Sequence, residues 1–236
     1  MNRAQFALGA FLAFILVAPV VLPEFHVTLL NYIGLYSIVA LGLVLLTGVG
    51  GLTSFGQAAF VGLGAYTTAY LTTAYGLSPW LSLLAGLALT FAVSIFLGFI
   101  SLRLSGHYLP LGTIAWGISL YFLFGNLDFL GGYTGISSLP AINFFGLVLD
   151  SGRSFDYLIW TLALLALLSM HNLLDSRSGR AIRALKGGGL MAESFGVDTA
   201  RMKIIIFVYA ALLASLSGWL YAHLLRFVNP TPFSIN

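Results

Sequence analysis

The chain has 236 residues and a formal net charge of +3, from 10 Lys and Arg against 7 Asp and Glu. Only 7% of its residues are charged and 59% are hydrophobic, whereas a soluble domain carries roughly 25% charged residues. This composition, with a mean hydropathy of +1.00, excludes an ordinary soluble domain. We expect an integral membrane protein surrounded by a lipid bilayer, and the small net charge does not indicate a nucleic-acid partner.

The first predicted element is an apolar run over residues 4–22, which follows a basic N-terminal start. Its length is close to the ~20 residues that a helix needs to cross a bilayer. It is longer than the apolar part of a typical signal peptide. We interpret it as an uncleaved first membrane span, with a cleaved signal peptide as the alternative.

Further apolar runs follow, each separated from the next by a charged or turn-rich segment. They cover residues 29–47, 53–74, 80–102, 109–126, 157–174 and 204–225. Because backbone polar groups in lipid must be hydrogen-bonded within their own segment, these runs are predicted to be helices. The expected fold is an all-α, polytopic helical bundle of about seven spans, forming a single domain over residues 1–236.

The basic residues indicate how these spans are oriented, because Lys and Arg are enriched in cytoplasmic loops. One side of the predicted topology receives Arg3, Arg103, Arg177, Arg180, Arg183, Lys186, Arg201 and Lys203, and the other side receives Arg153 and Arg226. We therefore expect the N-terminus and the loop 175–203 to be cytoplasmic. The loop 127–156 and the C-terminus are expected to face outward.

Small residues are frequent in the run 53–74. At helical spacing they predict one stripe along which another helix can approach closely. The stripe consists of Ser54, Ala58, Gly62, Ala65 and Ala69, and a similar stripe of Ala214, Gly218 and Ala222 in the last span is its candidate partner. For any single member, packing alone is the alternative to a role in transport.

The same run contains one amide, Gln57, which lies off the stripe. An unpaired amide in hydrocarbon costs several kcal/mol, so Gln57 is expected to face protein or a water-filled path. The preceding TGVGG (47–51) allows a kink or a half-helix start, as in many transport sites. Ser54 and Gln57 are therefore candidate residues of a translocation pathway, although Gln57 could instead hydrogen-bond across helices.

Known catalytic motifs are missing from the sequence. The glycines of LKGGGL (185–190) follow their lysine, whereas a phosphate-binding loop needs the lysine after the glycines. The 4 His are scattered without metal-ligand spacing, and there is no Cys. The predicted spans hold almost no ionisable residues, which ion-coupled transporters usually place in the membrane. We expect no catalytic residue, no metal and no cofactor.

The segment 175–203 is too patterned for a simple connection. Ala181, Ile182 and Leu185 can share one face of a short helix, opposite Arg180, Arg183 and Lys186. Three glycines at 187–189 break this helix. A second short helix is predicted over 190–195, with Gly196 at its C-terminal end and Asp198 or Thr199 as the cap of the next span.

Two interpretations of this segment remain open. It could lie on anionic lipid headgroups as an amphipathic helix. It could instead dock a cytoplasmic partner, because the second helix has little apolar area with which to hold lipid and because Glu193 could pair with a basic residue of that partner.

Four segments carry a family resemblance, and they occur in a consistent order. They are GLTSFGQAAFVGLGAYTTAYL (51–71), GGYTGISSLP (131–140), GRAIRALK (179–186) and AESFGVDTARMKIIIFVYAALLASLSGWLYAH (192–223). Together they resemble the ABC-transporter permeases of the branched-chain amino-acid uptake type, over nearly the whole chain from about residue 29 on.

The resemblance implies roles for residues of the loop 175–203. Ala192, Glu193, Ser194 and Gly196 match the family's coupling segment, and Arg180 and Arg183 match its basic lead-in. The three glycines at 187–189 replace polar or charged residues of the family. The family also continues beyond a segment like FVNPTPF (227–233), so the chain is expected to be a C-terminally truncated or shortened member.

By the same resemblance, the chain is expected to be a permease subunit of an ATP-driven importer in a bacterial inner membrane. The implied substrates are branched-chain or other apolar amino acids, with urea or short amides as the alternative. The implied partners are a second related permease, two cytoplasmic ATPases and a periplasmic or surface substrate-binding protein. The loop 127–156 would be a docking surface for that binding protein or a simple turn cluster.

Three other classes remain open. The first is a secondary transporter or channel for a small neutral solute, without ATPase partners. The second is a membrane enzyme acting on lipid, which would need His, Asp or Ser groups converging at one depth. The third is an assembly or anchoring subunit with no pathway of its own.

Overall fold

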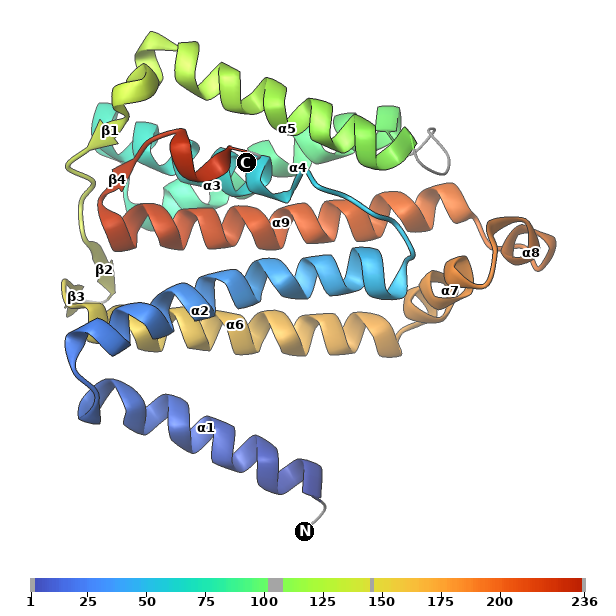
Figure 1. The fold of residues 1–236 in the computed structure, drawn as a ribbon, viewed down its shortest axis with the longest axis horizontal. Coiled ribbons are helices and arrows are strands. Elements are labelled where there is room, and N and C mark those ends of the chain that lie inside the picture. The colour runs from blue at the N-terminus through green and yellow to red at the C-terminus, as the bar shows by residue number, and fades with distance from the viewer. Residues whose placement is uncertain (1–2, 102–107, 145–146, 235–236) are drawn as a thin grey trace.

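A computed structural model describes residues 3–101, 108–144 and 147–234 of the chain, and its long helices lie side by side in one bundle (Figure 1). The long helices are α1 (Arg3–Val21), α2 (Glu24–Leu43), α3 (Gln57–Ala74), α4 (Pro79–Ser101), α5 (Tyr108–Asn126), α6 (Gly152–Asp175) and α9 (Thr199–Leu225). The prediction of an all-α, polytopic helical bundle is confirmed.

Length and composition support fewer membrane spans than the sequence patterns predicted. In the described part of the chain, 5 helices are long and apolar enough to cross a bilayer: Glu24–Val49, Pro79–Ser101, Tyr108–Asn126, Gly152–Asp175 and Thr199–Leu225. Of the two other expected spans, α1 (Arg3–Val21) enters this comparison only through its part Gly9–Val21, and α3 is not among the 5. Helix α3 is therefore the expected span whose composition differs from that of its neighbours.

Helix α3 has a physical reason to be less apolar than its neighbours. Most of its residues are buried inside the protein, between α9, α4 and α5. Helix α9 is also enclosed, with 67% of its most apolar window buried, against 28% for α4. A helix surrounded by other helices does not need a lipid-compatible surface, so α3 can carry amides, hydroxyls and glycines.

Short elements connect and follow the long helices. Those after α2 and α5 are η1, a π-helix (Val44–Val49), and two 3₁₀ turns, η2 (Asp128–Leu130) and η3 (Gly132–Thr134). Strand β1 (Ile136–Ser137) pairs antiparallel with β4 (Phe227–Val228), and β2 (Ile142–Phe144) pairs with β3 (Leu147–Leu149). The remaining elements are α7 (Arg177–Lys186), α8 (Gly189–Ser194) and the 3₁₀ turn η4 (Thr231–Phe233).

Polar caps, rather than the edges of apolar runs, decide where α6 and α9 begin, whereas α3 has no side-chain cap. Helix α6 begins at Gly152, because the Ser151 side chain accepts a hydrogen bond from the Ser154 backbone N–H. Helix α9 begins at Thr199, because Asp198, one of the two predicted caps, accepts a hydrogen bond from the Arg201 N–H at 2.9 Å. Helix α3 begins later than predicted, at Gln57, directly after Gly56.

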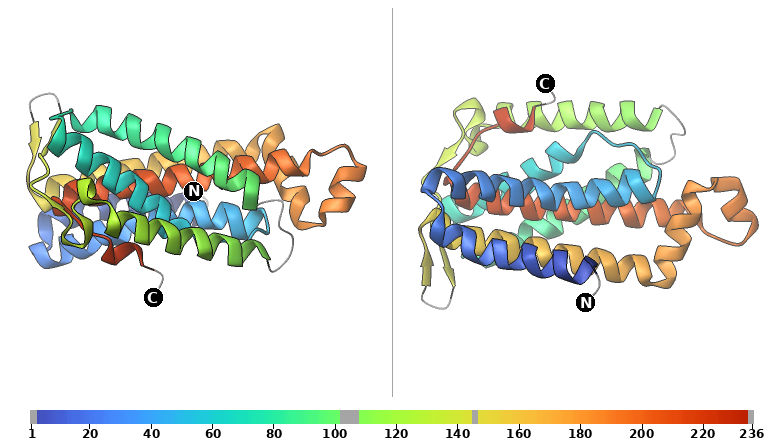
Figure 2. Two further views of the ribbon diagram at one scale, coloured as in Figure 1. Left: turned by 90° about the horizontal axis from the view of Figure 1, so that it is seen from above. Right: turned by 60° about the horizontal axis from the view of Figure 1, so that its bottom comes forward.

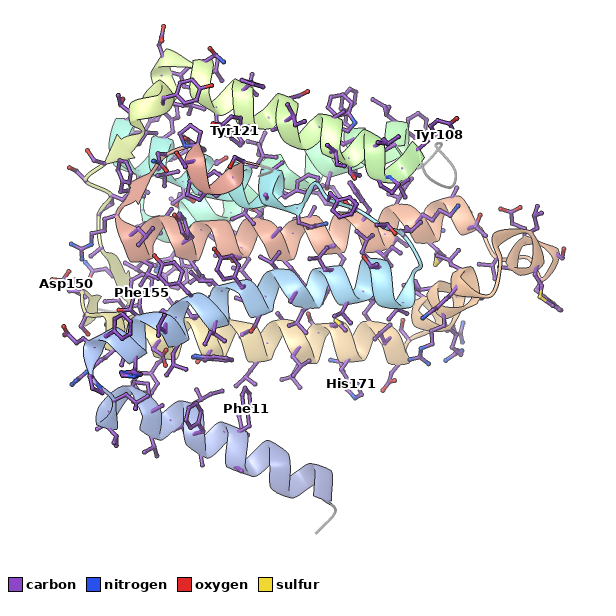
Figure 3. All side chains as sticks on the ribbon, in the orientation of Figure 1. Phe11, Tyr108, Tyr121, Asp150, Phe155 and His171 are labelled. Atoms are coloured by element: carbon purple, nitrogen blue, oxygen red, sulfur yellow. The ribbon has the colours of Figure 1, made fainter. Side chains whose placement is uncertain are left out.

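The two ends of the bundle carry different chemistry. Helices α7 and α8, with their basic residues, project beyond one end, and the short strands cover the other end (Figures 1 and 2). Figure 3 places Tyr108 at the first end and Asp150 at the second. Arg103 lies outside the described residues. The separation of charge is in line with the predicted orientation, which stays a prediction.

Candidate functional site

The chain breaks its helical course between α2 and α3. The last turn of α2 opens into the π-helix η1, where the Gly50 N–H donates to the Leu45 carbonyl at 2.9 Å. Residues 51–56 are not helical, and they run back into the bundle, so that α3 begins part of the way across it (Figures 1 and 2). A π-helix of this kind is rare and frequently lies at a functional site.

Glycines permit this course of the backbone. Gly51 has φ +67°, a left-handed conformation that side-chain-bearing residues rarely adopt. At Gly50, an added Cβ would come within 2.2 Å of Ile206 Cδ1, so the segment lies directly against α9. The predicted half-helix start is thus present in the structure, with η1 and these glycines as its cause.

Ser54 and Gln57 lie at the end of this non-helical segment, and both are buried, with exposed fractions of 6% and 5%. The Gly56 N–H donates to Ser54 Oγ at 3.4 Å, and the Phe55 N–H donates to Thr113 Oγ1 of α5 at 3.1 Å. The start of α3 is therefore held by local contacts and by one bond to a neighbouring helix.

The Gln57 side chain differs from Ser54 because neither its Oε1 nor its Nε2 has a hydrogen-bond partner among the described residues. A buried amide without partners is unfavourable by at least about 1 kcal/mol, and by more in hydrocarbon. Such a group is suited to a water molecule, a passing polar solute or a partner subunit. Gln57 is accordingly the polar group at the break with unused hydrogen-bonding capacity.

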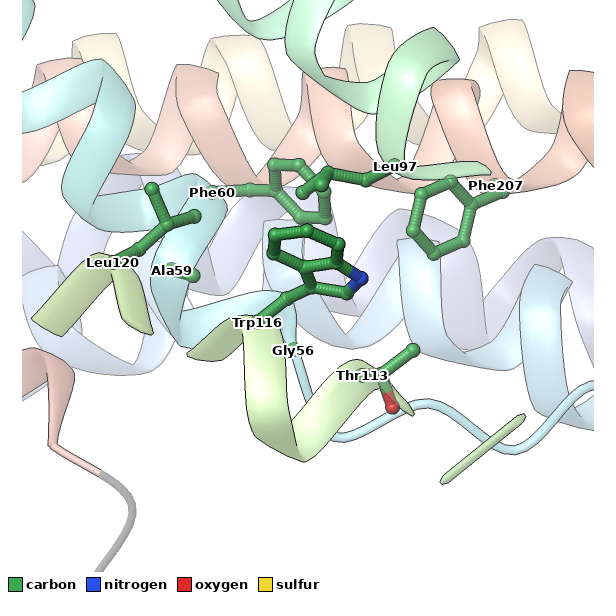
Figure 4. A pocket seen from close by; sticks show the side chains of 8 residues that line it. All are labelled: Gly56, Ala59, Phe60, Leu97, Thr113, Trp116, Leu120 and Phe207. Carbon is green, nitrogen blue, oxygen red and sulfur yellow. The ribbon is translucent and has the colours of Figure 1, made fainter. Parts of the chain in front are cut away.

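A small apolar cavity lies beside the start of α3 (Figure 4). It is lined by Gly56, Ala59, Phe60, Leu97, Thr113, Trp116, Leu120 and Phe207. Its volume of about 10 Å³ is close to the minimum for a single water. At this point the bundle is therefore closed to any molecule larger than water.

The packing of α3 against its neighbours differs in part from the predicted stripe. Ser54 precedes the helix, so the stripe begins at Ala58, which is half-buried and lines a separate cavity between α2, α3 and α9. Gly62 lies against α5, since an added Cβ would come within 2.5 Å of the Phe124 ring. Ala65 is completely buried, and its backbone N–H lies against Gly218 of α9.

Gly64, which is not part of the predicted stripe, gives α3 its close approach to Ser215 of α9. A Cβ on Gly64 would come within 2.2 Å of the Ser215 carbonyl oxygen. The sequence missed this residue because the run is rich in small residues on more than one face. The periodicity alone does not select the face that meets α9.

Helix α7 has the two faces that the sequence predicted. Ile182 and Leu185 are buried, whereas Arg180, Arg183 and Lys186 are exposed. Arg183 donates to the Leu174 carbonyl at 2.9 Å, at the C-terminal end of α6, where a cation is favourable. Arg183 thus has a structural contact, while Arg180 projects outward from the bundle.

Helix α8 ends in a Schellman motif. The Val197 N–H donates to the Ala192 carbonyl at 3.1 Å and the Gly196 N–H to the Glu193 carbonyl at 2.9 Å. Gly196 has φ +78°, so the predicted glycine C-terminus is confirmed. Ala192 is buried at 4% exposure. Glu193 is exposed but accepts a hydrogen bond from Thr199 Oγ1 at 2.5 Å, which joins α8 to the start of α9.

The apolar surface of α8 corrects one expectation from the sequence. This helix was expected to have little apolar area, but Leu190, Met191 and Phe195 are exposed at 85%, 64% and 79%. Such a cluster of large exposed apolar side chains beside charged ones is typical of a protein or membrane contact. The large apolar residues are visible in the sequence GLMAESF (189–195). Their exposure follows from the burial of Ala192, which fixes the side of α8 that faces the bundle.

The segment 127–156, at the opposite end, contains regular elements. Ile136 of β1 pairs with Val228 of β4, so the segment is hydrogen-bonded to the chain that follows α9. Arg226 forms an exposed ion pair with Asp150. Both predicted readings of this loop, a docking surface and a turn cluster, are compatible with these contacts.

The arrangement defines a class of protein: a polytopic helical membrane protein with a broken, glycine-rich helix in its core and a basic, partly apolar loop at one end. In the described part of the chain, no group of three or more His, Cys, Asp or Glu is placed to hold a metal ion.

The sequence identifies the family within this class. Residues 25–236 match the branched-chain amino acid transport system / permease component family, and the chain belongs to it. The chain is 34% identical over 225 residues to the high-affinity branched-chain amino acid transport system permease protein LivM of Escherichia coli, covering 85% of this chain and 53% of LivM.

More distant relatives include both kinds of permease protein. The probable LivM of Methanocaldococcus jannaschii is 27% identical, with 82% of this chain and 66% of that protein covered. The LivH permease protein of Salmonella typhimurium is 24% identical, with 83% and 68% covered. The chain therefore spans about half to two thirds of the length of these curated relatives. No solved structure gives a significant match.

Proposed function

We propose that this chain is a membrane-spanning permease subunit of an ATP-driven importer for branched-chain or other apolar amino acids. One observation carries the proposal. The chain belongs to the permease family, and its α7–α8 loop presents a compact, exposed and partly apolar surface around Glu193. ATP hydrolysis would reside in two cytoplasmic ATPase subunits that dock on this surface. The chain itself would hold no catalytic residue.

The proposal includes further partners, and the names of the relatives support one of them. LivM and LivH are both named as permease proteins of one kind of transport system, which supports a second, related permease beside this chain. A substrate-binding protein outside the membrane would deliver the amino acid to the end that carries β1 to β4. The membrane would be the inner membrane of a bacterial cell.

Ser54 and Gln57 are the residues we assign to the translocation pathway. They lie at the break between η1 and α3, where the backbone leaves the helix inside the bundle. A polar group without a partner at that place can bind the polar end of an amino acid. The closed cavity beside Gly56 implies that the helices must separate before a substrate passes.

The loop residues Arg180, Ala192, Glu193 and Gly196 are assigned to ATPase coupling. Gly196 and Ala192 shape the end of α8, and Arg180 and Glu193 present charges beside its apolar side chains. Arg183 contributes by holding α7 against the end of α6. Movement of docked ATPases would then be transmitted through α8 and α7 to the bundle.

The proposal is tested by co-purifying the chain with candidate ATPase subunits, followed by ATPase measurement in liposomes. Leucine delivered with a binding protein is expected to stimulate hydrolysis by the complex. Replacing Phe195 with Ser should weaken ATPase capture, while replacing Leu77, an apolar residue exposed at the other end, with Ser should not. Leucine uptake by the chain without any ATPase would instead favour a secondary transporter or channel.

A further inference from the structure

Lys186, the last residue of α7, makes a contact with a distant part of the chain. Its Nζ donates a hydrogen bond to the Gly48 carbonyl at 3.0 Å, across 138 positions of sequence. Gly48 belongs to η1, and its carbonyl lies beyond those of Leu45 and Leu46, which accept from the Gly50 and Leu52 N–H groups. A carbonyl at the end of a helix has no helical partner, so a lysine ammonium is a suitable donor to it.

Apolar packing supports the same junction. Ile182 and Leu185 of α7 belong to one buried cluster with Leu45 and Leu46 of η1 and with Ile206 of α9. The backbone of Gly51 lies against Lys186, since a Cβ on Gly51 would be 3.9 Å from the Lys186 Cα. Helix α7 therefore holds η1 by both a polar and an apolar contact, and it also lies against Gly51.

The segment that Lys186 holds leads directly to the proposed pathway. Thr47 Oγ1 donates to the Leu52 carbonyl at 3.3 Å, which ties η1 to residues 51–56. Ser54 lies within this stretch and Gln57 directly follows it, and the Phe55 N–H donates a hydrogen bond to Thr113 of α5. A displacement of α7 thus reaches the buried break through a few consecutive contacts.

We propose that Lys186 is a positioning residue that couples the α7–α8 loop to the break between η1 and α3, so that movement of α7 shifts residues 50–56 and with them Ser54 and Gln57. This inference rests on the proposed function, because it needs ATPases that move the loop. The inference adds one specific contact to that function, the hydrogen bond from the Lys186 ammonium to the Gly48 carbonyl.

The test uses the natural absence of cysteine and two spin labels. One label is placed at Thr53→Cys in the segment and the other at Ser137→Cys in β1; both residues are exposed. The distance distribution between them is measured for the native lysine, for Lys186→Met, which keeps the apolar stem, and for Lys186→Arg, which keeps the donor. Lys203→Met is the matched control, because Lys203 makes no hydrogen bond or ion pair with any described residue.

In the permease without ATPases, Lys186→Met is expected to broaden the distance distribution, whereas Lys186→Arg and Lys203→Met leave it narrow. An unchanged distribution in Lys186→Met overturns the proposal, whether or not ATPases bind. This measurement without ATPases tests the role of Lys186 independently of the proposed function. Failure of the proposed function would instead appear as the absence of any complex with ATPases.

In the complex with ATPases, nucleotide trapping is expected to shift the distance between the two spin labels, both in the native protein and in Lys186→Arg. The shift should be lost in Lys186→Met, and leucine-stimulated ATPase activity should fall at least about fivefold, the lower end of typical coupling effects. A Lys186→Met protein that inserts and melts like the native chain, yet keeps the full shift, would overturn the proposal, because the bond to the Gly48 carbonyl would then not be needed to move the segment.

Discussion

Gly218 of α9 lies directly against the Val61 backbone of α3, so closely that a Cβ on Gly218 would come within 2.0 Å of the Val61 carbonyl oxygen. The two helices cannot keep this separation if residue 218 has a side chain. Because the Val61 carbonyl belongs to a helix, it cannot move aside as a flexible side chain can.

Replacing Gly218 with Ala is expected to destabilise the bundle by up to about 3 kcal/mol, since overpacking of a tight core costs about 1–3 kcal/mol. In an open helix the same change would stabilise, because Ala is the better helix former. Thermal unfolding in detergent measures the effect. Gly9→Ala in α1, where nothing lies within 4 Å of an added Cβ, is the control and should melt at the native temperature or above.

Replacing Gln57 with Leu should separate stability from transport. The change removes two buried amide atoms that have no partner, so stability is expected to stay the same or rise. Leucine uptake in liposomes should fall about tenfold, as expected for the loss of one hydrogen bond worth about 1.4 kcal/mol. Thr68→Val, at another buried and unpartnered polar group of α3, should leave uptake unchanged. A joint loss of uptake and membrane yield in Gln57→Leu would assign the amide a purely structural role.

Glu193→Lys and Thr199→Val both remove the hydrogen bond between α8 and the start of α9, but only the first reverses the charge. If the Glu193 carboxylate contacts a basic residue of an ATPase, Glu193→Lys should abolish uptake and substrate-stimulated hydrolysis in a folded, inserted protein. Thr199→Val should keep most of both activities. Equal losses in the two variants would mean that only the internal bond matters.

Single cysteines at Ser137 and Ser194 test the orientation of the chain. Both residues are exposed, and they lie in β1 and α8 at opposite ends of the bundle. In intact cells, a membrane-impermeant maleimide is expected to label Ser137→Cys and not Ser194→Cys, and permeabilisation should expose both. The reverse pattern would invert the topology, and labelling of both in intact cells would contradict it.

The sequence determined the features that depend on local composition and periodicity. Low charge and long apolar runs indicated a polytopic helical protein, and the described helices overlap each predicted run. The two faces of α7 followed from the spacing of Ile182 and Leu185. The end of α8 followed from Gly196, because the left-handed backbone conformation at the end of a helix favours glycine.

Only the tertiary structure decided which of several similar residues meet. Small residues lie on several faces of α3, and the contact with Ser215 selects Gly64. The bond from Lys186 to the Gly48 carbonyl joins positions far apart in sequence, so no local pattern could indicate it. The late start of α3 and the exposure of Leu190, Met191 and Phe195 likewise depend on how neighbouring elements pack, because burial is a property of the whole fold and not of a segment.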